Sequence, residues 1–270
     1  MSTELRIQRG MRFGAWYVAE YRIRSMTKWI SEILAVSFGN PIIYLVAIGI
    51  GVGTLVDSNT GGAGINGVSY ITFLAPALLA TAAIQAAMDE TSFPTLEGFV
   101  WNKSFYGMNS TQLTAGQIVD GIMIAASARA FLTAGVYLIV LWGFGAVTLA
   151  SMPMLFLIAS LAGLSFGALM LAATSYVKED DGFFAIIARF VVAPMFLFSG
   201  TFYPLEQMPI FLQWIGWISP LWHSTNLARS VSFGLEVPGW LIIIHVSFLA
   251  ISLVAGVLIA RRQFASRLLK

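Results

Sequence analysis

The side chains that could carry out chemistry in this 270-residue chain are few and lie far apart. Cysteine is absent, which excludes disulfides, thiolate nucleophiles and cysteine-ligated metal or iron–sulfur sites. His223 and His245 are the two histidines, and no carboxylate lies close enough in sequence to predict a metal site with them. The residue inventory therefore argues against a metalloenzyme.

A nucleotide-hydrolysing site would need a glycine-rich loop that ends in Lys-Ser or Lys-Thr, because such a loop holds the phosphates. The one Lys-Ser pair is Lys103-Ser104, and Glu97 and Asn102 precede it where glycines belong. We therefore expect no cofactor in this chain. If ATP drives its function, a partner chain binds the ATP and Mg²⁺.

The composition is that of a membrane protein, with 58% hydrophobic and 10% charged residues. In soluble proteins about half of the residues are apolar and about a quarter are charged. The formal net charge of +2 does not indicate a nucleic-acid partner, because the basic residues lie at the edges of apolar runs and not on one face. Residues 1–28 are basic without a small-residue cleavage site, so we expect no cleaved signal peptide.

Six apolar runs predict membrane-spanning helices, because about 20 residues cross the ~30 Å hydrocarbon core. They lie at residues 33–56, in the later part of 58–88, twice within 130–177, at 183–203 and at 237–260. Turn formers between Gly143 and Pro153 divide the double run. The predicted fold is an all-α integral membrane protein with one domain over residues 1–270. Its parts are a cytoplasmic or interfacial N-terminus (1–28), a six-helix membrane domain (29–260) and a cytoplasmic basic tail (261–270).

A further apolar segment, residues 207–228, contains Pro209 and Pro220, which interrupt helices. Basic residues mark cytoplasmic loops, and here they gather before the first span and after the last. Both termini are thus predicted inside, which requires an even number of spans. Residues 207–228 are therefore expected to enter the membrane from outside and return, with Arg229 as the one basic residue outside.

No charge lies near the centre of a predicted span, which argues against an ion-coupled carrier. Arg129 and Arg189 lie about one turn from the cytoplasmic surface and can extend to it. For His245, in the last span, we expect a neutral packing residue and not a proton relay. A secondary transporter or channel without an ATPase partner is the alternative. A membrane enzyme is less supported, because the charged residues lie on opposite faces of the membrane.

Aromatic residues before the first span share roughly one helical face: Phe13, Trp16, Tyr17 and Tyr21. They predict an interfacial helix on the inner leaflet, although Glu20 and Arg24 interrupt the face. The alternative is a positively charged cap on the first span.

The connection from residue 89 to about 120 mixes acidic and aromatic side chains. We interpret it as a short helix that docks into a groove on a cytoplasmic ATPase, with aromatic anchors at the contact. The alternative is an aromatic belt packed on the inner leaflet. The candidate coupling residues are Glu97, Phe99, Trp101, Lys103, Phe105 and Tyr106.

On the outer side, aromatic residues crowd the broken apolar segment. Non-helical backbone at membrane depth survives only against protein or a water-lined cavity, so this segment is expected to cover the substrate path. Glu206 and Arg229 flank it, and we expect them to form an exposed pair that contributes about 0–1 kcal/mol. The candidate outer-gate residues are Tyr203, Trp214, Trp217, Trp222 and His223.

Several ordered motifs resemble a known family. The chain closely resembles the signature of type-2 ABC exporter permeases in one ordered set of residues. The set is FSGTFYP at residues 198–204, followed by Met208-Pro209, Leu212, Trp214, Pro220-Leu221, Leu227, Arg229 and Gly234. The second span resembles the family at Tyr70, Phe73, Leu74 and Pro76. The chain also resembles one branch of this family, the daunorubicin-resistance and nodulation-factor export branch. The residues that carry this resemblance are Gly98-Phe99, Trp101, Lys103, Tyr106 and Met108. The resemblance covers essentially the whole chain, with a departure at residues 112–115, where many members place a proline.

The resemblance implies a permease subunit of an ATP-driven exporter in the bacterial cytoplasmic membrane. It implies two permease chains with two cytoplasmic ATPase chains, a coupling helix between spans two and three, and re-entrant helices between spans five and six. It also implies that an amphiphilic or lipid-linked substrate enters from the inner leaflet and leaves outward. Family substrates include amphiphilic antibiotics, lipo-oligosaccharides and lipid-linked glycans, and fold-level analogy does not choose among them.

Small residues let membrane helices approach closely. One glycine motif, Gly49, Gly51 and Gly53, lies in the first span, and another, Gly163 and Gly167, lies in the fourth. Packing within one subunit explains either motif as well as dimerisation does. Because the family resemblance places spans one and five at the dimer seam, the first motif is the predicted homodimer contact.

Overall fold

The computed structural model describes the backbone of residues 3–62, 64–179 and 181–269, with side chains described from residue 12 onward. Within these ranges the chain is helical without a β-strand. The elements in chain order are α1 (Thr3–Met26), η1 (Thr27–Trp29), α2 (Ile30–Tyr44), η2 (Leu45–Val52), α3 (Gly53–Asn59), α4 (Tyr70–Thr91), α5 (Phe93–Val100), α6 (Ser104–Asn109), α7 (Ala115–Gly143), α8 (Met152–Tyr176), α9 (Phe183–Ile187), η3 (Ala188–Val192), α10 (Ala193–Phe198), η4 (Leu205–Gln207), α11 (Ile210–Trp217), α12 (Pro220–Phe233) and α13 (Gly239–Leu268).

Five helical stretches in the described ranges are long and apolar enough to cross a membrane, and they coincide with predicted spans one to four and six: Arg12–Asn59, Tyr70–Val100, Ala115–Gly143, Met152–Tyr176 and Gly239–Leu268. The fifth predicted span contains a shorter apolar stretch, Phe183–Phe198. Its length of about 24 Å is less than the ~30 Å hydrocarbon core. The sixth crossing therefore stays a prediction.

Local sequence explains where several helices begin. α7 starts with a capping box, in which the Thr114 side chain accepts from the Gln117 N–H and the Gln117 side chain accepts from the Thr114 N–H. Pro209 directly precedes α11, and Pro220 is the first residue of α12. They begin two short helices, where a missing N–H is tolerated, and do not interrupt one long helix.

α8 lies at the centre of the packing, against α4, α7 and α13. A Cβ added to Gly163 would lie 2.6 Å from the Ala83 carbonyl oxygen of α4, and one on Gly167 would lie 2.9 Å from the Ala87 Cβ. On the other side, a Cβ on Gly256 of α13 would lie 2.5 Å from the Ala168 carbonyl carbon. The glycines of the fourth span thus serve helix contact within one chain.

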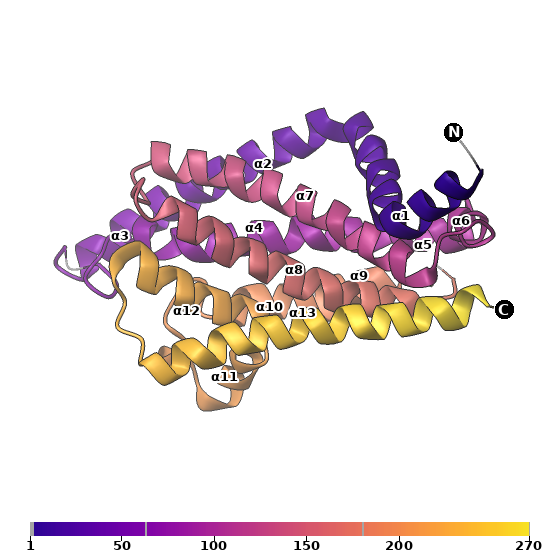
Figure 1. Ribbon diagram of the computed structural model, residues 1–270. Helices are drawn as coiled ribbons and strands as arrows, with labels where there is room; N and C mark the ends of the chain where they lie inside the picture. Colours follow the sequence, from indigo (N-terminus) through magenta and orange to yellow (C-terminus); the bar gives the residue numbers. More distant parts are fainter. Residues whose placement is uncertain (1–2, 63, 180, 270) are drawn as a thin grey trace.

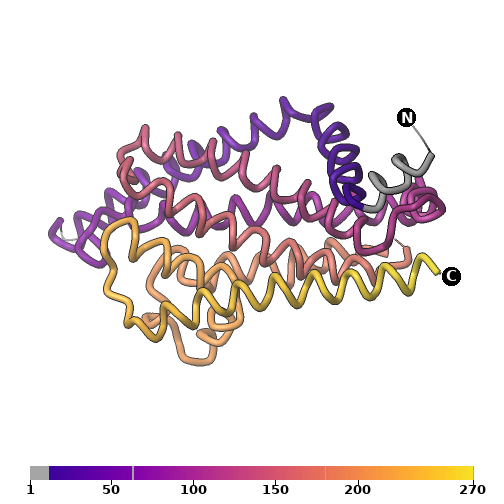
Figure 2. The backbone as a smooth tube through the Cα atoms, in the orientation of Figure 1, coloured from indigo at the N-terminus to yellow at the C-terminus, as the bar shows by residue number. Residues whose placement is uncertain are grey.

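Figures 1 and 2 show an elongated bundle with two distinct ends. α1, α5, α6 and the last turns of α13 lie at one end, and α3 lies at the other. α2 and α7 lead away from the first end, while α4, α8 and α13 return to it, and α11 and α12 lie in the half that contains α3. The first helix, α1, and the last turns of α13 therefore lie at the same end of the bundle.

α1 packs on α7, where a Cβ on Gly121 would meet the Ala15 carbonyl oxygen at 2.7 Å. Val18 and Ala19 are buried in this contact. The predicted aromatic face points outward, since Phe13, Trp16, Tyr17 and Tyr21 expose 45–54% of their area. Its placement on an inner leaflet remains a prediction.

The first span is irregular. Pro41 lies inside α2, and the segment that follows, η2, is π-helical. A Cβ on Gly49 would lie 3.0 Å from Ile71, and one on Gly53 would lie 3.6 Å from Tyr70, so both glycines face α4 of the same chain. Of the predicted dimer motif, Gly51 alone is exposed.

The last helix extends beyond its predicted span. α13 continues to Leu268, so the residues expected to form a basic tail are helical up to that point. Arg261 binds Asp120 of α7 through Nε and Nη2, at 2.9 and 2.6 Å. Phe264 and Leu268 are buried. This end of α13 therefore covers part of the connection between spans two and three.

Candidate functional site

A cavity of about 370 Å³, here called the inner cavity, lies between α1 and α2 on one side and α4, α5 and α7 on the other. Its polar lining comes mainly from three helices, on each of which the lining residues recur about once per helical turn and share one face, with Asp89 and Glu90 adjacent on α4. These residues are Glu32, Ser37 and Asn40 of α2, Gln85, Asp89 and Glu90 of α4, and Arg129, Thr133 and Tyr137 of α7. Ala82 and Ala86 of α4 also line the inner cavity. Their small side chains leave the space open.

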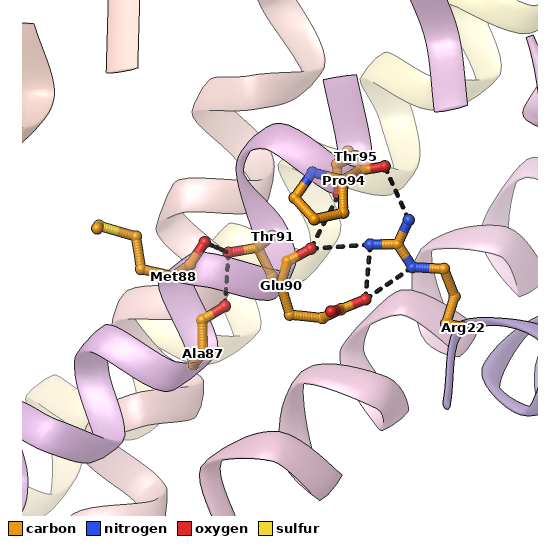
Figure 3. Close-up of polar contacts among 7 residues, drawn as sticks. All are labelled: Arg22, Ala87, Met88, Glu90, Thr91, Pro94 and Thr95. Carbon is orange, nitrogen blue, oxygen red and sulfur yellow. Dashed lines mark hydrogen bonds and ion pairs between the residues drawn. The ribbon is translucent and has the colours of Figure 1, made fainter. Parts of the chain in front are cut away.

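Arg22 of α1 forms the wall of the inner cavity nearest α5. Its Nε donates to Glu90 Oε1 at 2.7 Å and its Nη2 to the Glu90 carbonyl oxygen at 2.9 Å. Its Nη1 donates to the Pro94 carbonyl oxygen at 2.8 Å. Figure 3 shows the guanidinium bound to Glu90 at the end of α4 and to Pro94 at the start of α5. Only 7% of the Arg22 side chain and 3% of the Glu90 side chain are exposed.

The corner between α4 and α5 explains why Arg22 finds these acceptors. Ser92 adopts φ −97° and ψ −107°, which ends α4. The last carbonyls of a helix have no partner within it. Arg22 satisfies one of them together with the Pro94 carbonyl at the start of α5, so one side chain fixes α1 to two helices.

A second ion pair lines the inner cavity. Arg129 Nη2 lies 2.8 Å from Asp89 Oδ2, with 21% and 37% of the two side chains exposed. Gln85 Nε2 donates to the other carboxylate oxygen of Asp89 at 2.7 Å. Deeper in the bundle, the hydroxyls of Ser37 and Thr133 lie 3.2 Å apart and join α2 to α7.

The predicted coupling residues of α5 and α6 separate into two groups. Glu97, Trp101 and Lys103 are exposed, with 55% of Trp101 accessible. Phe99 and Phe105 are buried, and Tyr106 is half-buried. The prediction that Phe99 and Phe105 face a partner chain is wrong.

Phe99 and Phe105 are buried because the end of α13 covers them. The Phe264 ring lies 4.6 Å from the Phe99 ring and 5.6 Å from the Phe105 ring, between centroids. The Arg267 guanidinium lies 3.9 Å above the Phe99 ring. α5 and α6 are thus attached to the bundle by an aromatic cluster and present Glu97, Trp101 and Lys103 outward.

A second cavity of about 310 Å³, here called the outer cavity, lies near the α3 end, between the residue 198–204 motif and the start of α13. Of the predicted outer-gate residues, Trp222 lines it, together with the two flanking charges Glu206 and Arg229. Trp214 and Trp217 are instead 52% and 47% exposed on α11. Tyr203 is half-buried outside the lining.

Arg229 corrects the expectation of an exposed pair. It is 3% exposed, and it donates from Nε to the Phe73 carbonyl and from Nη2 to the Thr201 carbonyl, both at 3.2 Å. Its guanidinium lies 3.6 Å above the Phe73 ring. Glu206 is exposed and forms no ion pair with it among the described contacts. Arg229 is therefore a buried link between α12, α4 and the 198–204 motif.

His223 and His245 form a buried pair between α12 and α13, with their Nδ1 atoms 2.7 Å apart. His223 Nε2 lies 3.0 Å from the Trp217 carbonyl, which can only accept, so that nitrogen carries a proton. His223 Nδ1 then accepts from His245 Nδ1–H. This assignment of Nδ1 holds for a neutral pair, and the contact ties α12 to α13.

The profile of the ABC-2 type transporter family matches residues 18–233. The chain belongs to this family. It is 30% identical over 260 residues to Nodulation protein J of Rhizobium leguminosarum bv. viciae, covering 95% of this chain and 96% of that protein. It is 32% identical over 246 residues to Nodulation protein J of Neorhizobium galegae, covering 88% of each. It is also 24% identical over 168 residues to the Probable multidrug ABC transporter permease YbhR of Escherichia coli, covering 61% of this chain and 44% of that protein.

The family predicted from the motifs is thus confirmed, and the nodulation-related relatives agree with the predicted branch. This ABC-2 permease is a multi-pass membrane transport subunit. The family match includes Arg22, the α5–α6 surface and Arg229.

Sequence reasoning missed three features of this permease: the inner cavity, the Arg22–Glu90 pair and the histidine pair. Arg22 and Glu90 are separated by 68 positions, and the two histidines by 22. One signal was present, because Ser37, Asn40, Gln85, Thr133 and Tyr137 are polar positions inside predicted spans. Polar side chains in a span face protein or a cavity and mark functional sites.

Proposed function

We propose that this ABC-2 permease is the membrane subunit of an ATP-driven exporter that moves an amphiphilic or lipid-linked substrate outward across the bacterial cytoplasmic membrane. The observation that carries the proposal is the family match over residues 18–233 in a chain whose sequence lacks a phosphate-binding loop. ATP and Mg²⁺ would be bound by two copies of a separate cytoplasmic ATPase. A second copy of the permease completes the transporter, and exposed Gly51 is the remaining glycine candidate for their contact.

The α5–α6 surface is the proposed ATPase contact. Trp101 is a large aromatic side chain that is 55% exposed directly after α5, next to the cluster of Phe99, Phe105 and Phe264 that attaches α5 and α6 to the bundle. Such an anchor is typical of interface hot spots. Glu97 and Lys103 would form the polar rim around it.

The Trp101→Ala variant is expected to weaken association with the ATPase by about 30-fold, since an interface hot spot contributes about 2 kcal/mol. The measurement is the amount of ATP-hydrolysing subunit that co-purifies with the tagged permease from its native membrane. Trp142→Ala, at the far end of α7 and also 52% exposed, is the matched control. Phe105→Ala tests folding instead, because that ring is fully buried.

Equal ATPase recovery with Trp101→Ala and Trp142→Ala would place the contact elsewhere. If the unmodified permease recovers no ATPase, the chain is a secondary transporter or channel.

We further propose six crossings, in which the α9–α10 stretch is the fifth and α11–α12 re-enters from outside. In Figures 1 and 2 the α9–α10 stretch leads toward the half that holds α11 and α12. α1 would lie on the inner leaflet, and Trp222 and Arg229 would line the outer gate. His223 would stabilise that gate by attaching α12 to α13 through its hydrogen bond with His245.

Single cysteines in this cysteine-free chain test the crossings. Gln207→Cys and Glu236→Cys flank α11 and α12, and both positions are exposed. We expect a membrane-impermeant thiol reagent to label both from outside, and to label exposed Ser266→Cys only after the cells are opened. Labelling of positions 207 and 236 from opposite sides would mean that α11 and α12 together cross the membrane.

A further inference from the structure

The inner cavity carries polar side chains at a depth where a membrane protein normally presents apolar ones. Asn40, Thr133 and Tyr137 line it from within the predicted first and third spans. A polar group in an apolar environment is costly unless it is hydrogen-bonded. Thr133 bonds to Ser37, but the side chains of Asn40 and Tyr137 have no hydrogen-bond partner in the part of the chain that the structure describes. Tyr137 is 2% exposed overall, and its hydroxyl is reachable from the inner cavity, where it is available to a polar ligand.

The charges of the inner cavity restrict that ligand. Its two cationic residues are Arg22 and Arg129, and each already binds a carboxylate, at 2.6 and 2.8 Å. The other charged residues in the lining are the carboxylates Glu32 and Glu97. A phosphate group would therefore meet negative charge without a free cation to neutralise it, while amide, phenol and hydroxyl groups remain available.

The apolar residues around the inner cavity indicate that its ligand also has an apolar part. Val36 of α2 lines the cavity and is itself 56% exposed, so polar lining and outward apolar surface adjoin on one helix. Trp29 and Tyr21 also line the cavity and expose 59% and 46% of their area. Tryptophan and tyrosine are enriched at membrane–water interfaces. A molecule with a polar head in the cavity could thus keep its apolar tail in lipid.

We propose that the inner cavity binds the uncharged, hydrogen-bonding headgroup of a membrane amphiphile, with Asn40 and Tyr137 as direct contacts. The proposal deepens the exporter function and rests on it for the role of the ligand. Binding itself is measured on the permease alone, so failure of one proposal is distinguishable from failure of the other.

The test uses native mass spectrometry of the purified permease in an equimolar mixture of three lipids with the same acyl chains. These are monoglucosyl diacylglycerol, phosphatidylethanolamine and phosphatidylglycerol. We expect the uncharged glycolipid to be retained about tenfold more than either phospholipid, which corresponds to about 1.4 kcal/mol. The double variant Asn40→Leu with Tyr137→Phe is expected to lose this preference, since it removes both polar contacts at nearly constant volume.

Ala82→Leu is an independent variant that fills the inner cavity and leaves its polar groups in place. It should also reduce glycolipid retention by about tenfold. Asn226→Leu, in the outer cavity, is the matched control and should behave as the unmodified protein. Equal retention of the three lipids, preference for either phospholipid, or an unchanged preference in both cavity variants would overturn the proposal.

A second measurement separates the two sources of such a headgroup. If the ligand is exported cargo, adding the glycolipid to the reconstituted complex with its ATPase should raise ATP turnover. If the ligand is a resident lipid, turnover should stay constant while retention persists. A complex without any ATP turnover would contradict the exporter function and leave the lipid result standing.

Discussion

The Arg22→Ala variant is expected to lose about 3–5 kcal/mol of unfolding free energy, because it leaves the Glu90 carboxylate buried without its partner. Glu90 is 2% exposed, and the same substitution also removes the donors to the Glu90 and Pro94 carbonyls. Chemical unfolding of the detergent-solubilised permease measures this loss.

α1 itself offers a matched control. Arg24 pairs with Glu20 at 2.6 Å, the same distance as in the Arg22–Glu90 pair, but 77% of the Arg24 side chain is exposed. An exposed pair contributes about 0–1 kcal/mol, so Arg24→Ala should be close to neutral. Equal stability of the two variants would mean that Arg22 does not hold α1 on the α4–α5 corner.

Arg22→Lys separates charge from geometry at the same position. Lysine keeps the positive charge but lacks the planar fork that reaches three acceptors on two helices. We expect a stability between those of the unmodified protein and Arg22→Ala. Because α5 carries the proposed ATPase contact, ATPase recovery should fall with Arg22→Ala and remain normal with Arg24→Ala.

The Gly256→Leu variant is expected to prevent stable packing of α13 on α8. A Cβ at this position would lie 2.5 and 2.7 Å from the Ala168 carbonyl carbon and oxygen, which are backbone atoms and cannot rotate away. Overpacking costs about 1–3 kcal/mol when side chains can adjust, and a backbone contact leaves less room to adjust. The measurement is the yield of monodisperse protein after membrane extraction, which should fall to a small fraction of the unmodified level.

Gly135→Leu is the control for this substitution, because nothing lies within 4 Å of a Cβ added there on α7. It should extract normally. Normal extraction of Gly256→Leu as well would show that α8 and α13 can separate without loss of the fold.

The five long helices could be predicted because a charge-free apolar run is a strong and local signal. Residues 207–228 were also interpreted correctly as broken, since two prolines forbid one regular helix there. The fifth span was harder to predict. Arg189 lies in it, and the structure divides the stretch into α9, η3 and α10, of 5, 5 and 6 residues.

The sites were less predictable because they depend on contacts between distant segments. The aromatic side chains of α5 and α6 suggested a surface exposed to water. Phe99 and Phe105 are instead covered by Phe264 and Arg267 of α13, a helix that was expected to end earlier. Likewise, the position of Arg229 beside the outer loop suggested exposure. Its burial depends on acceptors at Phe73 and Thr201, which no local pattern specifies.

The π-helical stretch η2 has a consequence for how this chain tolerates changes in length. A π turn holds one residue more than an α turn, so deleting one residue within Leu45–Val52 lets the stretch return to regular α-helical bonding. The flanking helices α2 and α3 then keep their faces. The same deletion in the middle of α7 would rotate all later residues by about 100° and turn Tyr137 away from Arg129. Natural length variation among related permeases should therefore collect in η2, and be excluded from α7.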